Sequence, residues 1–369
     1  MAPKTSHRKG THIMRIHSTR ALAVATASLL TLGLAACGGT SKGDETGGAG
    51  PASTAQADPN AALKEGLKIA FLPKQLNNPY SDVLAGGGEV AVGELKGEYK
   101  LVGPNDAAAS SQVSYINTLI QQQQDVIGIA ANDPNAVCPS LNQARQAGIK
   151  IVSFDSDASK DCRDVFINQA TTQGIGESLA KMANELAGGE GEIAILSATP
   201  NATNQNAWIK VVEAELQKPE NSKLKLVKTV YGNDDDQKSF QEAQGLLQSY
   251  PNLKVIVSPT TVGIAAAARY VSSSNFKGKV AITGLGLPNQ MREYVKDGTV
   301  SKFSLWVPSD IGYLAAYAGA ALASGQITGA AGEKFTAGKL GEYTIAADGE
   351  IVLGPPTEFT AQNIDQFDF

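Results

Sequence analysis

Histidine is almost absent from this chain of 369 residues, since its three copies, His7, His12 and His17, all stand near the N-terminus. Imidazole is the usual general base of enzymes and the commonest transition-metal ligand. The rest of the chain therefore excludes a histidine-dependent hydrolase and a zinc or copper site, and we expect neither a metal nor a cofactor. Phosphate motifs are also missing. The sequence contains no GxxxxGK[ST], and GLGLPN at 284–289 lacks the third glycine of a dinucleotide fingerprint.

Cysteine is scarce, with Cys37, Cys138 and Cys162 as the three copies. No C-x-x-C spacing occurs, which argues against redox catalysis. Outside the cytosol a pair of cysteines is more often a disulfide than two free thiols. We therefore predict a Cys138–Cys162 disulfide, which closes a loop of about 25 residues and contributes roughly 3 kcal/mol. The alternative is two small buried side chains.

The first 36 residues have the composition of an export signal. A basic stretch without acids precedes residues 21–36 (ALAVATASLLTLGLAA), which are uncharged and mostly apolar. As a helix, that run would span about 24 Å, short of the roughly 30 Å membrane core, so a permanent transmembrane anchor is the less favoured alternative. Leu34–Cys37 (LAAC) resembles the lipobox of bacterial lipoproteins. The resemblance implies a signal peptide at 1–36, lipidation of Cys37 and a lipid anchor on the outer face of the bacterial cytoplasmic membrane.

Residues 37–66 are rich in Gly, Ser, Thr, Ala and Pro, and we predict a flexible tether there. The remaining stretch of about 300 residues is long for one hydrophobic core and comfortable for two. Five of the 31 basic residues stand in the first 20 positions, so 26 remain against 36 acids, a net charge of −10. Such an acidic chain is a poor ligand for nucleic acid.

From residue 67 onward, short apolar runs alternate with amphipathic helical stretches in two successive series. The apolar runs are 67–74, 99–104, 125–133 and 150–157, then 191–199, 224–232, 253–260 and 279–286. Apolar strands separated by helices are typical of parallel sheets covered on both faces, so we predict two doubly wound α/β lobes. We expect residues 343–356 to form a hairpin of the second lobe around Asp348-Gly349. The run NDDDQ at 233–237 is interpreted as a solvated turn and helix cap.

Open parallel sheets bind ligands beyond the carboxyl ends of their strands. In this sequence the loops at those positions are rich in amides and hydroxyls with a few acids, and Tyr80, Trp208 and Trp306 stand among them. Amides and carboxylates align hydroxyl groups, while aromatic rings cover the apolar face of a sugar ring. The loops therefore favour a polyhydroxylated ligand.

Segments spread over nearly the whole chain after residue 66 resemble the type I periplasmic sugar-binding proteins of ABC importers, and within them the rhamnose-binding proteins and the autoinducer-2 receptors. Among these segments are IAFLPK, SFDSDASKDCR, NATNQNAWI, ITGLGLPNQM and NIDQFDF. The resemblance implies two lobes joined by a three-crossover hinge, with lobe one at 67–168 plus 288–306 and lobe two at 169–287 plus 307–369. It implies a monomeric binding protein, not an enzyme, whose partners are a sugar and the permease transmembrane subunits.

The resemblance also implies a set of ligand-binding residues. The ligand positions of the autoinducer-2 receptors fall on Lys74, Asp155, Asn204, Gln205, Pro259 and Thr261. Asn204 and Thr261 depart from the receptor pattern, which has aspartate and alanine there. We add Tyr80, Asp157 and Trp306 from the same loops. The competing interpretation is structural: Asp155 and Asp157 as turn residues, Asn204 and Gln205 as helix-end groups, Lys74 as a solvated cation, and Tyr80 and Trp306 as packing.

The predicted function is capture of L-rhamnose or a close 6-deoxyhexose. Leu285 and Gly286 stand where ribose- and galactose-type binders carry an acid, and the added apolar surface suits a methyl group. An autoinducer-2 receptor is the nearest alternative. A sugar-cleaving enzyme would need two flanking carboxylates, for which Asp155 and Asp157 are the obvious pair. A sugar-responsive transcription factor would need a basic DNA-binding headpiece where the signal peptide stands.

Overall fold

The structure, a computed structural model, describes residues 56–108 and 110–369. The predicted signal peptide, the lipidation site Cys37 and most of the predicted tether lie outside the described residues. Where the tether prediction reaches the structure, the structure differs. Residues 58–66 are fixed at the C-terminal end of helix α9 (Pro308–Ser324), where Asp58 N donates to Gly325 O at 2.9 Å and Lys64 Nζ to Ala323 O at 2.8 Å. The carbonyls at a helix end need outside donors, and composition does not reveal that this segment supplies them.

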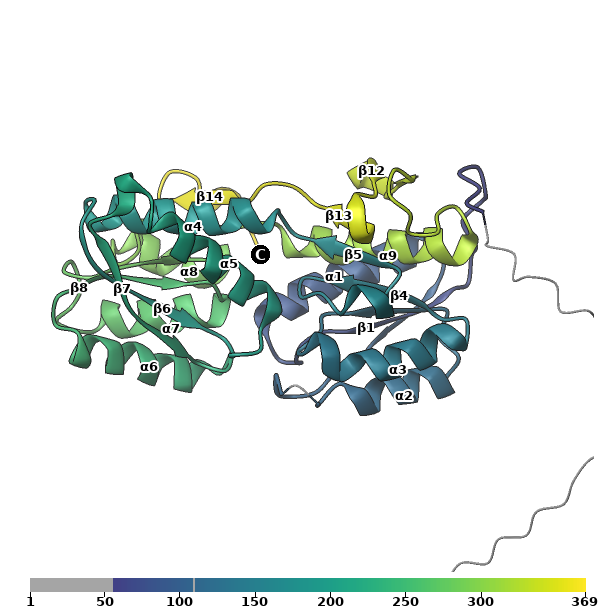
Figure 1. Ribbon diagram of the computed structural model, residues 1–369, viewed down its shortest axis with the longest axis horizontal. Helices are drawn as coiled ribbons and strands as arrows, with labels where there is room; N and C mark the ends of the chain where they lie inside the picture. The colour runs from purple at the N-terminus through teal and green to yellow at the C-terminus, as the bar shows by residue number, and fades with distance from the viewer. Residues whose placement is uncertain (1–55, 109) are drawn as a thin grey trace, which may run out of the picture. The chain divides into compact units, whose positions relative to one another are not determined.

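The first sheet is parallel throughout. Its described strands are β1 (Lys68–Leu72), β2 (Glu98–Leu101), β3 (Val126–Ile129), β4 (Lys150–Phe154), β5 (Val165–Asn168) and β13 (Glu350–Val352), in the order β13-β5-β4-β3-β1-β2. Helices α1 (Pro79–Glu94) and α9 cover one face, and α2 (Val113–Gln121) and α3 (Pro134–Gln146) cover the other (Figure 1). Because both faces are covered, the central strands are continuous apolar runs.

The second sheet repeats this plan. Its described strands are β6 (Gly191–Ser197), β7 (Leu224–Tyr231), β8 (Leu253–Ser258) and β9 (Ala281–Gly284), parallel and in the order β7-β6-β8-β9. Helices α4 (Thr172–Ala187) and α5 (Thr203–Glu215) pack together on one face, with α6 (Asp236–Ser249) and α7 (Thr261–Ser272) on the other (Figure 1). The two sheets confirm the predicted fold class of two doubly wound lobes.

Within the described residues, the chain passes between the sheets three times: after β5, after β10 (Lys302–Leu305), and between β13 and β14 (Thr357–Thr360). Residues 288–305 and 308–352 fall on the opposite lobes from those predicted, while 357–369 belongs to lobe two as predicted. Helix α8 (Pro288–Lys296) packs against α7, and Ser304 of β10 bridges to Leu285, so 288–305 belongs to lobe two. Helix α9 packs against α1 and β13 pairs with β5, so 308–352 belongs to lobe one.

The predicted division failed because α9 is buried along nearly its whole length, and a helix that is apolar on every side carries no pattern that says which sheet it covers. The predicted hairpin at 343–356 is also wrong. Strand β12 (Glu342–Thr344) pairs with β11 (Lys334–Thr336), while β13 joins the edge of the first sheet in parallel with β5. Strand β14 then pairs with β10 and returns the chain to lobe two.

The two cysteines of the described chain are joined. Cys138 of α3 and Cys162, in the connection between β4 and β5, form a disulfide with a Cα–Cα distance of 5.4 Å. This connection begins with Asp155, directly after β4. The disulfide therefore fixes the far end of the loop that carries one of the predicted ligand residues.

Helices α1 and α9 approach closely because glycines lie at their contact. A Cβ added to Gly312 of α9 would collide with the carbonyl oxygen of Leu84, and one added to Gly87 of α1 would collide with that of Ser309. Because protein interiors are close-packed, the two helices could not accommodate an extra methyl group at these positions without moving apart. The contact fixes α1, whose first turn carries Tyr80.

We expect Gly312→Ala to lower the free energy of unfolding by about 1 to 3 kcal/mol, because the added methyl overpacks the α1–α9 contact. The matched control is Gly86→Ala, in α1, where the new Cβ meets nothing within 4 Å. That control should raise stability by up to about 1 kcal/mol, since alanine favours helix over glycine. Urea unfolding of both variants measures the difference, and equal effects would contradict the close approach.

Candidate functional site

The loops at the carboxyl ends of the strands of both sheets surround a cavity with about 450 Å³ of empty space, part of it open to solvent. This is the place that parallel α/β sheets use for ligands. The lining residues come from both lobes and are Lys74, Asn78, Tyr80, Asp155, Asn204, Gln205, Trp208, Asp234, Pro259, Thr260, Thr261, Leu285, Leu305 and Trp306.

Lobe one contributes a chain of hydrogen-bonded polar groups. Lys74 stands two residues after β1, and its Nζ lies 3.8 Å from Oδ2 of Asp155. The Tyr80 hydroxyl donates to Asp155 Oδ1 at 3.0 Å and accepts from Trp306 Nε1 at 2.8 Å. The first turn of α1 is held by Asn78, whose side chain accepts from the backbone N–H of Tyr80. A cation, a carboxylate and a phenol are thus fixed at one end of the first sheet.

The carboxylate of Asp155 is buried, and its environment shifts its pKa upward from the ordinary value. Burial raises the pKa of Asp155, the Lys74 charge and the Tyr80 hydrogen bond oppose the shift, and the charge of Asp234 reinforces it. Burial and the nearby Asp155 charge also raise the pKa of Tyr80 well above its ordinary value. The phenol therefore stays protonated and available as a donor. Asp155 has a φ of 59°, a left-handed conformation that aspartate tolerates better than most residues.

Lobe two meets this group through Asn204, in the first turn of α5. Asn204 Oδ1 accepts from Lys74 Nζ at 3.2 Å, and its Nδ2 donates to the carbonyl oxygen of Asp155 at 3.3 Å. Both bonds join one lobe to the other. Gln205 lines the cavity too, but its Oε1 accepts from Ser197 Oγ and Ala198 N, each at 2.8 Å. Gln205 therefore holds the β6–α5 connection in place.

Asp234 is a cavity residue that the sequence analysis did not select. Its carboxylate accepts a hydrogen bond from Thr260 Oγ1. Burial raises the pKa of Asp234, while the Lys74 charge and the Thr260 hydrogen bond oppose the shift. The interpretation of NDDDQ as a turn and helix cap holds for Asp235, whose carboxylate accepts from Lys238 N at 2.6 Å, but not for Asp234. The strand-end rule that selected the other loops would have found Asp234, because it follows β7.

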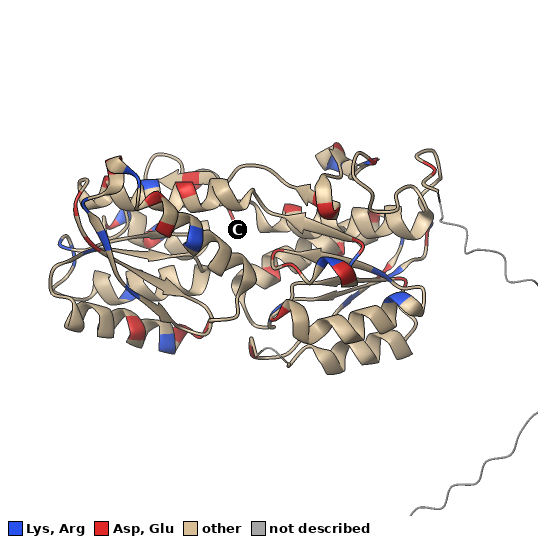
Figure 2. Ribbon diagram, viewed as in Figure 1, with Lys and Arg blue, Asp and Glu red and all other residues tan. Residues whose placement is uncertain are grey.

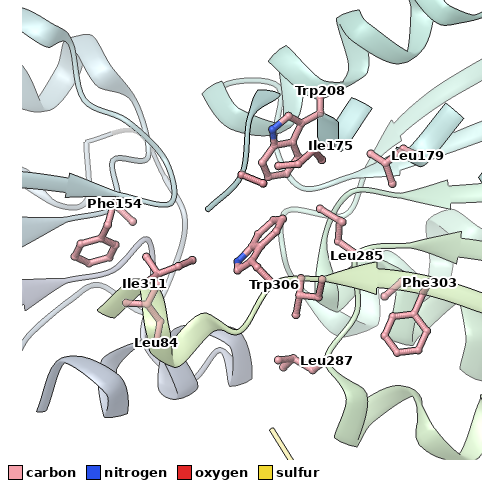
Figure 3. Close-up of a cluster of buried hydrophobic side chains, with 14 of the residues drawn as sticks. Leu84, Phe154, Ile175, Leu179, Trp208, Leu285, Leu287, Phe303, Trp306 and Ile311 are labelled. Atoms are coloured by element: carbon pink, nitrogen blue, oxygen red, sulfur yellow. The ribbon is translucent and has the colours of Figure 1, made fainter. Parts of the chain in front are cut away.

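Aromatic and aliphatic groups complete the lining. Trp306 stands in the crossover between β10 and α9, and its ring centroid lies 5.9 Å from that of Trp208 and 6.3 Å from that of Tyr80. Figure 3 shows Trp306 between Ile311 on the lobe-one side and Leu285 on the lobe-two side. Trp208 is buried, as packing on a helix face predicts, and lines the cavity as well. The cavity therefore combines charged groups with indole rings.

Asp157 does not line the cavity. Its Oδ1 accepts from Arg163 Nε at 2.7 Å, its Oδ2 accepts from Arg163 Nη2 at 2.8 Å, and Ser153 Oγ also donates to it. Arg163 is buried, so this pair holds the loop after β4. The other predicted ligand residues do lie together in the lining.

The profile of the periplasmic binding protein domain family matches residues 69–327. A sugar ABC transporter structure from Actinomyces odontolyticus is 58% identical, with a TM-score of 0.68, covering 82% of this chain and 98% of that one. A solute-binding protein from Clostridium phytofermentas with bound L-rhamnose is 39% identical, with a TM-score of 0.80 and the same coverage. LsrB from Clostridium saccharobutylicum, in complex with AI-2, is 23% identical over 82% of this chain and 99% of its own, with a TM-score of 0.75.

The chain therefore belongs to the periplasmic binding protein domain family. The predicted resemblance to the type I branch that includes rhamnose-binding proteins and autoinducer-2 receptors is confirmed. By its description, this is a family of periplasmic, that is extracytoplasmic, binding proteins. In residues 56–108 and 110–369, no helix has the length and apolar character needed to cross a bilayer.

We expect Asp157→Asn to lower the free energy of unfolding by about 2 to 4 kcal/mol, because it leaves the buried Arg163 guanidinium without its carboxylate. Ligand affinity should stay within about threefold, since Asp157 is outside the cavity. Denaturant unfolding and calorimetry measure the two effects. If the variant kept its stability but lost ligand binding, Asp157 would be a ligand-binding residue after all.

We expect Asp234→Asn to raise the stability of the unliganded protein at pH 7. The folded-state pKa of Asp234 is raised from an ordinary value of 3.8, so its ionisation at neutral pH costs folding free energy, and this cost disappears below that value. The gain of the variant should therefore shrink as the pH falls toward 4. Thermal unfolding across this range measures it, with Asp236→Asn as control, and a gain that grows on acidification would contradict the assignment.

Proposed function

We propose that the protein is the solute-binding component of a carbohydrate ABC importer and that it binds L-rhamnose, or a close 6-deoxyhexose, between its lobes. The observation that carries this proposal is the composition of the cavity, which combines hydrogen-bonding side chains, indole rings and leucines at the strand ends of two sheets. The similarity to the sugar ABC transporter structure and to the rhamnose-bound protein supports it.

The polar lining suits the hydroxyls of a sugar. Lys74 offers N–H donors, Asp155 and Asp234 offer carboxylate acceptors, and charge-assisted bonds of this kind are the stronger ones. Trp208 and Trp306 offer flat apolar faces for the C–H groups of a pyranose ring. A neutral monosaccharide presents both kinds of surface at once.

The apolar lining suits a methyl group in place of the sixth hydroxyl. Leu285 and Leu305 line the cavity beside Trp306. Neither leucine side chain can donate or accept a hydrogen bond. A hydroxyl placed against them loses its water without gaining a partner, which costs binding free energy. Where the sugar carries a methyl instead, its burial contributes favourably.

Binding between two hinged lobes links the ligand to the conformation of the protein. A sugar that contacts Lys74 and Asp155 of lobe one and Asn204 of lobe two stabilises the arrangement in which these lobes meet. We propose that the permease transmembrane subunits recognise this arrangement, that the protein acts as a monomer, and that Cys37 carries its lipid anchor. A diacylglyceryl group supplies the two chains that stable anchoring takes.

Two alternatives remain as outcomes of the tests. Lys74 and Asp155 match autoinducer-2 receptor positions, which favours AI-2 as the second candidate ligand. The enzymatic alternative named Asp155 and Asp157 as its carboxylate pair, and Asp157 is engaged with Arg163. Turnover of a nitrophenyl rhamnoside by the purified protein would show that the enzymatic alternative is correct.

The test is titration calorimetry with L-rhamnose, L-mannose, D-ribose and AI-2. We expect L-rhamnose to bind about 10- to 100-fold more tightly than L-mannose, which differs by a hydroxyl on the sixth carbon. Lys74→Met and Asp155→Asn should each weaken binding about 10- to 100-fold, because each removes a charged hydrogen-bonding partner.

Lys160→Met is the matched control for Lys74→Met, since Lys160 makes an exposed ion pair with Asp348. Its affinity for L-rhamnose should equal that of the native protein. Tight binding of AI-2 without binding of rhamnose would select the alternative receptor, and no heat with any of the four compounds would refute the sugar proposal.

A further inference from the structure

Three consecutive aspartates follow β7, and the structure uses each differently. Asp235 caps α6, and Asp236 forms an ion pair with Arg269 at 2.7 Å on the exposed side of that helix. Asp234 instead lies in the cavity lining, where its partner is the Thr260 hydroxyl. Thr260 occupies the position before α7, yet its side chain makes no capping bond to that helix. Asp235 and Asp236 thus stabilise the fold, whereas Asp234 lines the cavity.

The backbone at this point is held in an unusual conformation. Asn233 and Asp234 have φ values of 58° and 51°, so two successive residues with side chains adopt left-handed geometry. Such conformations persist where the surroundings fix them, and they cluster at ligand-binding positions. Here hydrogen bonds from both lobes hold the segment: Asn233 N donates to Ala198 O of lobe two at 2.7 Å, and Gln75 Nε2 of lobe one donates to the carbonyl oxygen of Asp234 at 3.2 Å.

The charges in the cavity do not balance. The described lining contains one cation, Lys74, and two carboxylates, Asp155 and Asp234. The ammonium group of Lys74 is already shared between Asp155 and the amide oxygen of Asn204. An anionic ligand would therefore be repelled by two carboxylates. The one cation of the described lining, Lys74, already interacts with Asp155 and Asn204 and would attract the ligand only weakly. Asp155 is buried, which strengthens its part of this repulsion because less water is present to screen it.

We propose that Asp234 is a specificity-determining residue, which accepts a hydroxyl hydrogen bond from the bound sugar and, together with Asp155, excludes anionic sugars such as uronic acids and sugar phosphates. This inference rests on the proposed function, since it needs a sugar in the cavity. Thr260 acts as a positioning residue that orients the carboxylate. Lobe two thereby contributes a charged contact that matches the Lys74–Asp155 group of lobe one.

The test compares Asp234→Asn with Asp236→Asn, which removes the same charge two residues away and outside the cavity. Asparagine is among the residues that best tolerate left-handed geometry, so Asp234→Asn keeps the loop. We expect Asp234→Asn to weaken L-rhamnose binding about 10- to 100-fold, as loss of a charged acceptor does. Asp236→Asn should stay within about twofold of the native protein. Calorimetry measures both, and circular dichroism verifies that each variant is folded.

The second readout is the ratio of affinities for L-rhamnose and for L-mannuronate, which has a carboxylate where rhamnose has its methyl group. This ratio should fall at least about tenfold in Asp234→Asn and stay unchanged in Asp236→Asn. If Asp234→Asn fails to fold, Thr260→Val provides the test, with an expected several-fold loss of rhamnose affinity. An unchanged ratio would overturn the exclusion of anions.

The two proposals fail in different ways. If the native protein binds none of the neutral sugars, the proposed function itself falls. If the native protein binds L-rhamnose and Asp234→Asn binds it within about threefold, the sugar-binding function stands and the role of Asp234 is refuted.

Discussion

The ammonium group of Lys74 is the point on which the site depends. It lies between a carboxylate of lobe one and an amide of lobe two, and its side chain is only 14% exposed. A cation in such a place requires partners, because burying an unpaired charge costs several kcal/mol. The partners in turn come from loops after different strands, so one group ties together the ends of both sheets. Figure 2 shows the other basic and acidic residues distributed over both lobes.

The surrounding architecture keeps that group in place by packing. The glycine contacts between α1 and α9 set the position of the first turn of α1, and Tyr80 reaches from that turn to Asp155. The disulfide and the Asp157–Arg163 pair hold the other side of the Asp155 loop. Trp306 connects this set to lobe two through its contacts with Tyr80 and Trp208. The glycine contacts, the disulfide and the Asp157–Arg163 pair thus support the site from outside the cavity lining.

The two-lobe fold and the loops that form the cavity could be predicted from the sequence. Parallel strands buried on both faces are continuous apolar runs, and their ends locate the loops. That reasoning located the loops, and the resemblance to the autoinducer-2 receptors selected Lys74, Asp155 and Asn204 within them. It failed for α9 and β13, since a helix buried on all sides and a three-residue edge strand carry no information about which sheet they join. Asp234 was missed because its run was interpreted as a turn, and Asp157 was assigned to the ligand although it pairs with Arg163. Turn chemistry and ligand chemistry use the same residue, and only the partners, Thr260 and Arg163, distinguish them.

The attachment of residues 58–66 has a mechanical consequence. The hydrogen bonds of this segment to the rest of the described chain include those from Asp58 and Lys64 to the end of α9 and one from Gly66 N to Lys96 O, and all of these acceptors belong to lobe one. A pulling force applied upstream of Asp58 is therefore taken up by one lobe, and the three crossovers bear no load.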